Sequence, residues 1–149
     1  MARPVANTRG DYRHAREITT RWMDNDAYGH VNNVVHYSYF DTVVNDWLIR
    51  HGLLDVEKGA IIGLVVETGC LYFEPLTYPE TVTAAMRVAH VGKSSVRYEI
   101  ALFGEGRATA AAQGHFVHVY VDRQTRRPTA LPESWRLALA TLKIGPGAS

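Results

Sequence analysis

Two aspartates, a histidine and three asparagines lie in one short polar segment, Asp24-Asn25-Asp26-Ala27-Tyr28-Gly29-His30-Val31-Asn32-Asn33. A long apolar segment follows, and the first backbone N–H groups of a helix there would carry partial positive charge. A carboxylate beside such donors can perform acyl transfer, as a nucleophile or as a general base on water, while the N–H groups stabilise an oxyanion. From the residues alone, the alternative is that Asp24 and Asp26 only order the loop or cap the helix.

The element that would position this loop is a helix expected from Asn32 to His51. Its apolar residues recur three and four positions apart, at Tyr37, Phe40, Val44, Trp47 and Leu48. A second apolar stripe lies beside the first, so the helix is predicted to be covered on most sides. Asn32 or Asn33 is the expected N-cap, and Gly52 follows the last turn as a C′ residue.

The rest of the chain is predicted to be mostly strand, with a first strand over 16–22 ahead of the polar loop. Further strands are expected over 61–73, 81–91, 95–103 and 107–122. Glycine-containing turns after the third and fourth of these five strands predict antiparallel neighbours.

A short C-terminal helix is expected to begin at Pro132 and to carry an apolar face made of Trp135, Leu137, Leu139 and Leu142. The predicted fold class is therefore α+β, with a five-stranded antiparallel sheet wrapped around one long helix. The last strand has apolar residues on both of its faces. We expect the uncovered sheet face, or a sheet edge, to contact a second subunit.

The composition is that of an ordinary globular protein, with 149 residues, 46% of them hydrophobic and 21% charged. We expect a flexible N-terminal arm over residues 1–14, a single domain over 15–143 and a disordered tail over 144–149. The net charge of +1 offers no basic surface for a nucleic acid. The sequence predicts no membrane segment or secretory signal, and the lone Cys70 excludes an internal disulfide, so a cytoplasmic location is expected.

The segment from Asp24 to Asn33, with Tyr37 one turn later, resembles the 4-hydroxybenzoyl-CoA thioesterase family of hotdog-fold proteins. That family carries a D-x-D-x-x-G-x-V pattern before its central helix, often in the variant G-H-V-N-N-x-x-Y. The resemblance extends over roughly residues 15 to 140. It includes the strand order, Pro75 after the second strand, a Gly-Lys-Ser-Ser turn and a closing Leu-Pro-Glu-Ser-Trp.

The resemblance implies a hotdog fold that hydrolyses acyl-CoA thioesters, and neither a metal ion nor another cofactor. It implies that Asp26 is the catalytic carboxylate and that the backbone N–H of Asn33 polarises the thioester carbonyl. Subunits of this family generally pair their sheets side by side into dimers, and dimers often pair again, so a homodimer or homotetramer is expected. A metal site made of Asp24, Asp26 and His30 is disfavoured because their spacing matches no standard site.

Several further residues are candidates with two interpretations each. His30 is a catalytic candidate that would bond Asp26 or the substrate, or it holds the loop. Tyr37 would line the acyl pocket or belong to the core. Glu67, in the middle of a strand, would contact substrate or form an ion pair. Lys93, Ser94 and Ser95 on a hairpin turn would bind the phosphates or pantetheine of CoA, or they serve solubility.

The sequence therefore predicts an acyl-CoA thioesterase in which Asp26 acts as nucleophile or general base. The rival prediction is a non-catalytic module that binds acyl-CoA or an acyl carrier protein, because a fold does not determine a function. Neither the acyl group nor the choice between CoA and carrier protein follows from the sequence.

Overall fold

The computed structural model describes residues 4–144. Five strands, two α-helices and two short 3-10 helices follow one another along the chain. Their bounds are η1 Arg9–Asp11, β1 His14–Thr19, η2 Trp22–Asp24, α1 Asn33–Arg50, β2 Ile61–Tyr72, β3 Thr81–Val91, β4 Ser95–Phe103, β5 Ala112–Asp122 and α2 Glu133–Ala140.

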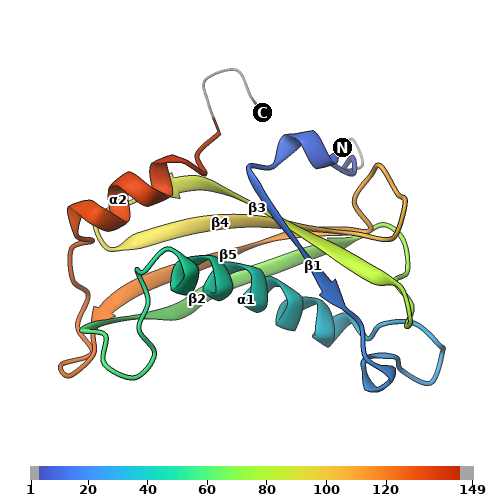
Figure 1. Ribbon diagram of the computed structural model, residues 1–149, viewed down its shortest axis with the longest axis horizontal. Coiled ribbons are helices and arrows are strands. Elements are labelled where there is room, and N and C mark those ends of the chain that lie inside the picture. Colours follow the sequence, from blue (N-terminus) through green and yellow to red (C-terminus); the bar gives the residue numbers. More distant parts are fainter. Residues whose placement is uncertain (1–3, 145–149) are drawn as a thin grey trace.

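The strands form one antiparallel sheet in the order β1-β3-β4-β5-β2. Helix α1 lies across one face of this sheet, and α2 lies on the same side near the turn between β3 and β4 (Figure 1). We call this covered side the inner face and the opposite side the outer face. This is the hotdog architecture, and it confirms the fold class expected from the sequence.

Helix α1 begins and ends close to the predicted positions. The Asn32 side chain accepts a hydrogen bond from the backbone N–H of Val34 at 2.9 Å, so Asn32 is the N-cap. Gly52 after the helix has φ +70°, the left-handed conformation that ends many helices at glycine. Phe40, Val43 and Val44 are completely buried, whereas Val34 and Ile49 are 68% and 49% exposed. The helix is therefore covered on one broad apolar side, and not on most sides as predicted.

The inner core is built by alternating residues of the central strands. Val82, Ala84, Met86 and Val88 of β3 point toward α1, together with Val96, Tyr98, Ile100 and Leu102 of β4. Trp135 and Leu139 of α2 close one end of this core. Leu137, predicted for the same apolar face, is 64% exposed, because a residue two positions from both partners points to the other side of a helix.

Two predicted strands are shorter than expected. The first ends at Thr19, and Trp22 belongs instead to η2, whose geometry is fixed by Asp24. The last begins at Ala112 and not at Arg107, because the chain turns at Gly104–Arg107 and Gly106 has φ +67°. The connection between β4 and β5 is therefore a longer loop, whereas the predicted turn at Gly92 is tight, with a Gly92 N–H to Ser95 O bond of 2.7 Å.

The segment ahead of β1, expected to be a flexible arm, contacts the outer face of the sheet. Tyr12 is 8% exposed and packs edge-to-face on Phe103 of β4. The backbone N–H of Asn7 donates to the Gln113 side chain of β5 at 2.7 Å. The predicted disordered tail lies, apart from residue 144, outside the described residues.

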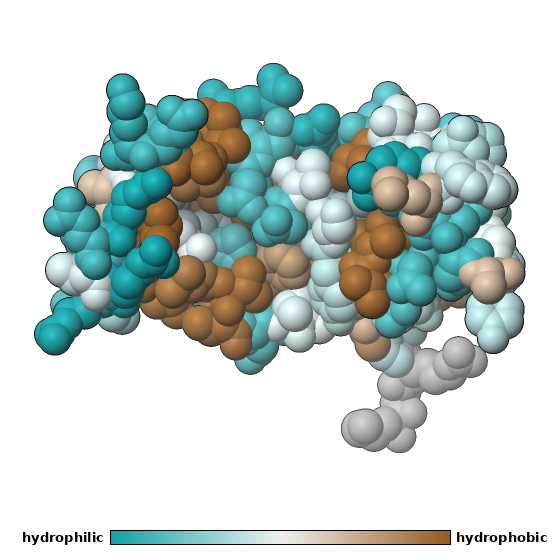
Figure 2. Space-filling model, turned by 90° about the horizontal axis from the view of Figure 1, so that it is seen from below, coloured by the Kyte–Doolittle hydropathy of each residue, from teal (hydrophilic) through white to brown (hydrophobic). Residues whose placement is uncertain are grey.

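The edge strand β2 carries exposed apolar side chains that no element of the described chain covers. Val65 and Val66, at a β-bulge of this strand, are 49% and 60% exposed. Figure 2 shows hydrophobic side chains gathered in separate areas on the side of the molecule seen from below Figure 1. None of the helices within residues 4–144 is both long and apolar enough to cross a membrane.

Candidate active site

Asp24 holds the loop between β1 and α1 in place. Its side chain is almost completely buried and accepts hydrogen bonds from the Tyr39 hydroxyl at 2.7 Å and the Arg21 backbone N–H at 2.9 Å. The Arg21 guanidinium also pairs with it at 2.9 Å. Burial alone would raise the pKa of this carboxyl, but the bonds from Tyr39 and Arg21 outweigh it and hold the pKa below its ordinary value.

Asp26 lies in a tight turn next to this anchor. Its backbone N–H donates to the His30 carbonyl at 2.8 Å, and its side chain accepts from the Tyr28 N–H at 2.9 Å. Gly29, which donates to the Asp26 carbonyl at 3.0 Å, has φ +79°, a conformation that favours glycine. The turn leaves the side chain of Asp26 partly exposed. Oδ1 is hydrogen-bonded, and Oδ2 has no partner among the described residues.

The start of α1 presents an unpaired donor beside this turn. The Val34 N–H is capped by the Asn32 side chain, and the Val35 N–H donates to the Asn32 carbonyl at 2.9 Å. Within the described part of the chain, the Asn33 N–H between them has no acceptor. Such an N–H at a helix start carries partial positive charge and can bind a carbonyl oxygen that becomes negative.

A cavity of about 280 Å³ opens at this helix start. Its lining consists of His30, Val31, Asn33, His36, Tyr72, Phe73, Glu74 and Pro75. The walls combine apolar side chains with two imidazoles. The structure therefore brings the predicted residues Asn33 and His30 together, with Asp26 joined to His30 through the turn but outside the lining of the cavity.

His36 and Tyr72 are site residues that the sequence analysis missed. The His36 ring is buried, and its Nδ1 lies 3.1 Å from the Asn32 carbonyl oxygen. A carbonyl only accepts, so Nδ1 carries the proton and Nε2 has the lone pair. Burial lowers the pKa of His36 below its ordinary value and keeps the ring neutral. The Tyr72 hydroxyl donates to the Asn33 carbonyl at 3.1 Å, and its ring meets His36 edge-on.

A signal for His36 is present in the sequence pattern itself. Counting along G-H-V-N-N-x-x-Y from Gly29 places the tyrosine of the pattern at position 36, which is a histidine here. Tyr37, one residue later, instead stacks on Phe116 and packs against Phe40. It does not line the cavity at the helix start. No comparable sequence signal identifies Tyr72, because its contact with α1 comes from the tertiary structure.

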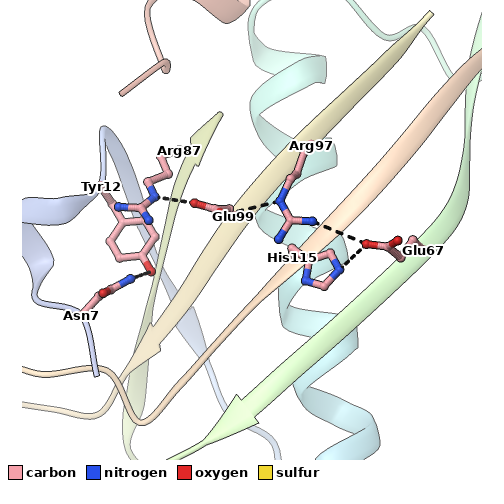
Figure 3. A network of polar contacts seen from close by, with 7 residues as sticks. All are labelled: Asn7, Tyr12, Glu67, Arg87, Arg97, Glu99 and His115. Carbon is pink, nitrogen blue, oxygen red and sulfur yellow. Dashed lines mark hydrogen bonds and ion pairs between the residues drawn. The ribbon is translucent and has the colours of Figure 1, made fainter. Parts of the chain in front are cut away.

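Glu67 lies on the outer face, away from α1. Its carboxylate is 2.7 Å from Nε2 of His115 and 3.5 Å from the Arg97 guanidinium. Figure 3 shows this network continuing from Arg97 through Glu99 to Arg87. Gly69 makes room for His115, because a Cβ at that glycine would lie 2.9 Å from the ring. The ion-pair interpretation of Glu67 thus has structural support, and its contact with substrate stays a prediction.

Lys93, Ser94 and Ser95 occupy the turn between β3 and β4. In a single chain this turn lies at the end of the sheet opposite the start of α1. It is fixed in place by α2, whose Arg136 donates to the carbonyls of Gly92 and Lys93. The structure therefore does not bring these predicted binding residues to Asn33 within one chain.

Metal ligands and the single cysteine were two further possible sources of chemistry. Residues 4–144 contain no cluster of three or more histidine, cysteine or acidic side chains that could hold a metal ion. Burial raises the pKa of the Cys70 thiol to about 11, so this cysteine is protonated at neutral pH and is a poor nucleophile.

Comparison with known proteins agrees with this architecture. The family model of the thioesterase-like superfamily matches residues 20–139. The crystal structure of the PA5185 protein from Pseudomonas aeruginosa strain PAO1 is 51% identical, with a TM-score of 0.91, over 93% of this chain and 97% of that chain. The PA2801 protein from Pseudomonas aeruginosa, described as a candidate thioesterase, is 31% identical, with a TM-score of 0.78, over 86% and 98% of the two chains.

A more distant structure shares the fold. Slr0204 from Synechocystis, a 1,4-dihydroxy-2-naphthoyl-CoA thioesterase, has a TM-score of 0.76 at 16% identity, over 85% of this chain and 94% of that chain. Among curated protein sequences, none matches this chain. The family match spans most of the chain and coincides with the loop, helix and sheet that build the site. This protein therefore belongs to the thioesterase-like superfamily.

Proposed function

We propose that this protein is an acyl-CoA thioesterase of the 4-hydroxybenzoyl-CoA thioesterase type, which hydrolyses a thioester to a free acid and CoA. The observation that carries the proposal is the Asn33 N–H at the start of α1, which has no acceptor among residues 4–144, together with the cavity that Asn33 lines beside the Asp26 turn. Superfamily membership and relatives named as thioesterases support the same chemistry.

In the proposed reaction, the thioester carbonyl oxygen accepts a hydrogen bond from the Asn33 N–H. The carboxylate of Asp26 then attacks the carbonyl carbon or activates a water molecule that does so. Negative charge develops on the carbonyl oxygen next to the positive end of the helix dipole, which lowers the barrier. Asp24 keeps Asp26 in position through its bonds to Tyr39 and Arg21, and His30 supports the turn through its backbone carbonyl.

A second copy of the chain completes the proposed binding site. The exposed apolar side chains of β2 favour an antiparallel pairing of this edge strand with its counterpart, because an open edge strand offers unpaired backbone groups and apolar surface to another chain. Such a pairing brings the partner's β3–β4 turn to the end of the sheet where α1 begins. Lys93, Ser94 and Ser95 of one subunit would then lie near the CoA that is bound at the α1 start of the other subunit. The outer face of each sheet would remain available for the pairing of two dimers into a tetramer.

The proposal is tested with a panel of short, long, branched and aromatic acyl-CoA thioesters, by following release of free thiol. We expect hydrolysis of at least one class by the wild type. The variant Asp26→Asn should fold normally and lose turnover by a factor of about 100 or more, because it lacks the reacting carboxylate. Turnover of this variant at the wild-type rate would refute the assignment of Asp26 as the reacting carboxylate.

The rival function is a binding module for acyl-CoA or acyl carrier protein. It makes the opposite prediction for the same panel, namely saturable binding without release of thiol from any member. Thiol release therefore separates the two functions in one experiment.

A further inference from the structure

We infer that His36 is the proton acceptor for the water molecule that completes hydrolysis, which leaves Asp26 the role of nucleophile. This inference rests on the proposed thioesterase function. It adds His36 to the site and separates the role of the base from that of the nucleophile. It starts from the position of His36 in the lining of the same cavity as Asn33.

The first step of the argument is the protonation state of the ring. Nδ1 is held at 3.1 Å by the Asn32 carbonyl, at the N-cap of α1, so the neutral ring has its lone pair on Nε2. This nitrogen has no hydrogen-bond partner within the described residues. Among the described residues, only Nε2 of His14 and Nε2 of His118 are fully buried side-chain atoms without a hydrogen-bond partner. Nε2 of His36 is therefore not fully enclosed, and its ring belongs to the lining of the cavity.

The second step is the set of groups that face the ring. Tyr72 of β2 meets it edge-on with ring centroids 4.9 Å apart, and the Tyr72 hydroxyl is occupied by the Asn33 carbonyl. His30 and Glu74 line the same cavity. The Glu74 carboxylate pairs with the Arg107 guanidinium at 2.6 Å, so its charge is compensated. The lone pair on Nε2 of His36 is thus a basic nitrogen in the lining of the cavity that Asn33 also lines.

The third step is the chemistry. The Asp26 carboxylate attacks the thioester carbonyl carbon, the C–S bond breaks, and CoA leaves as a thiolate that takes a proton from solvent. A water oxygen then attacks the carbonyl carbon of the acyl-Asp26 anhydride while its proton passes to Nε2 of His36. The bond from that carbon to Asp26 breaks, the carboxylate is regenerated, and the imidazolium returns its proton to solvent. Imidazole suits this task because its ordinary pKa lies near neutrality.

The variant His36→Ala tests the inference, since it removes the base and leaves space for free imidazole. We expect one equivalent of CoA to be released rapidly, followed by turnover reduced by about 10²–10⁴-fold, the usual contribution of a general base. Mass spectrometry of the intact protein should show the added acyl group. Free imidazole in the buffer should speed turnover of this variant at least tenfold.

The variant His36→Gln covers the case in which the alanine variant folds poorly, because its amide can still donate to Asn32 but cannot accept a proton. It should be as slow as His36→Ala. The wild type should lose kcat as the pH falls below the pKa of His36, and His36→Gln should lack this acid limb.

His51→Ala is the matched control. Nδ1 of His51 lies 2.9 Å from the Trp47 carbonyl oxygen. Like His36, it therefore bonds the carbonyl four residues earlier, but it does so at the other end of α1. It should hydrolyse thioesters like the wild type and should not respond to imidazole.

Two results would overturn the inference while leaving the thioesterase function intact. One is hydrolysis by His36→Gln within threefold of the wild type. The other is a slow His36→Ala variant that neither accumulates the acyl adduct nor responds to imidazole. If the wild type itself releases no thiol from any thioester, the proposed function fails, and that outcome is seen before any variant is made.

Discussion

Replacing His118 by phenylalanine should make the stability of this protein less sensitive to acid. His118 of β5 is 3% exposed and is surrounded by the rings of Tyr98, Phe116 and Tyr120. Nδ1 lies 3.3 Å from the Tyr120 hydroxyl, and Nε2 is buried without a partner. Burial lowers the pKa of His118 to about 4, because a charged imidazole is poorly solvated there.

The magnitude follows from the two pKa values. In the unfolded chain the imidazole titrates at about 6.5, so it binds a proton well before the folded state does as the pH falls. The ionisation of His118 therefore leaves the stability unchanged above about pH 6.5 and lowers it progressively as the pH drops toward 4. Linkage gives a loss of about 2 kcal/mol between pH 7.5 and pH 5, rising to about 3 kcal/mol below pH 4.

At pH 7.5 the substitution should be close to neutral. It removes a buried nitrogen that lacks a partner, which offsets the strain of a slightly larger ring. The Tyr120 hydroxyl loses its 3.3 Å contact with Nδ1 but stays hydrogen-bonded to the Tyr98 hydroxyl at 2.7 Å.

The assay is urea unfolding of the wild type and His118→Phe at pH 7.5 and pH 5, at one protein concentration because oligomers gain stability with concentration. The stability difference between the two proteins should shift by about 2 kcal/mol in favour of the variant at the lower pH. His90→Phe, at an exposed position of β3, is the matched control and should show no such shift. If the free energy of unfolding falls by the same amount from pH 7.5 to pH 5 in the wild type and in His118→Phe, His118 is not the cause of the acid sensitivity.

Three further outcomes are expected. Asp24→Asn should lower the free energy of unfolding by about 2 kcal/mol in the same urea assay, because the bonds from Arg21 and Tyr39 lose their charged acceptor; unchanged stability would contradict this anchoring role. Val66→Glu should dissociate the proposed dimer in sedimentation velocity by placing charges at the β2 edge, and an unchanged mass would exclude pairing through this strand. Lys93→Ala should raise KM for acyl-CoA but not for the matching acyl-pantetheine, whereas equal effects on both substrates would show that Lys93 does not contact the nucleotide.

The sequence alone determined most of the elements and the antiparallel pairing of β3 with β4 and of β4 with β5, whereas the pairing of β1 with β3 and of β2 with β5 came from the tertiary structure. The three- and four-residue spacing of apolar residues predicted α1 to within a residue or two at each end, because helix periodicity is a local property. The strict alternation in β3 and β4, with a tight turn at Gly92, predicted both strands at their observed bounds. Boundaries failed where a turn or a side-chain contact intervened, as at Trp22 and Arg107.

The candidate site was predictable only in part. The polar segment pointed to Asp26 and to the start of α1, because both lie in one stretch of sequence. Tyr72 comes from the far end of β2, and its contact with Asn33 exists only after the sheet is assembled. The tautomer of His36 likewise depends on the capped helix start that brings the Asn32 carbonyl to its ring.

The sequence could also not decide which face of a strand a charged residue occupies when a bulge changes the alternation. Glu67 follows the bulge at Val65 and Val66, which shifts the register of β2 against β5. The shift places Glu67 on the outer face with His115 and Arg97. Local spacing therefore determined the elements and the position of the reacting loop, whereas the faces, the cavity and the partners of each polar group were decided by contacts between residues far apart in the chain.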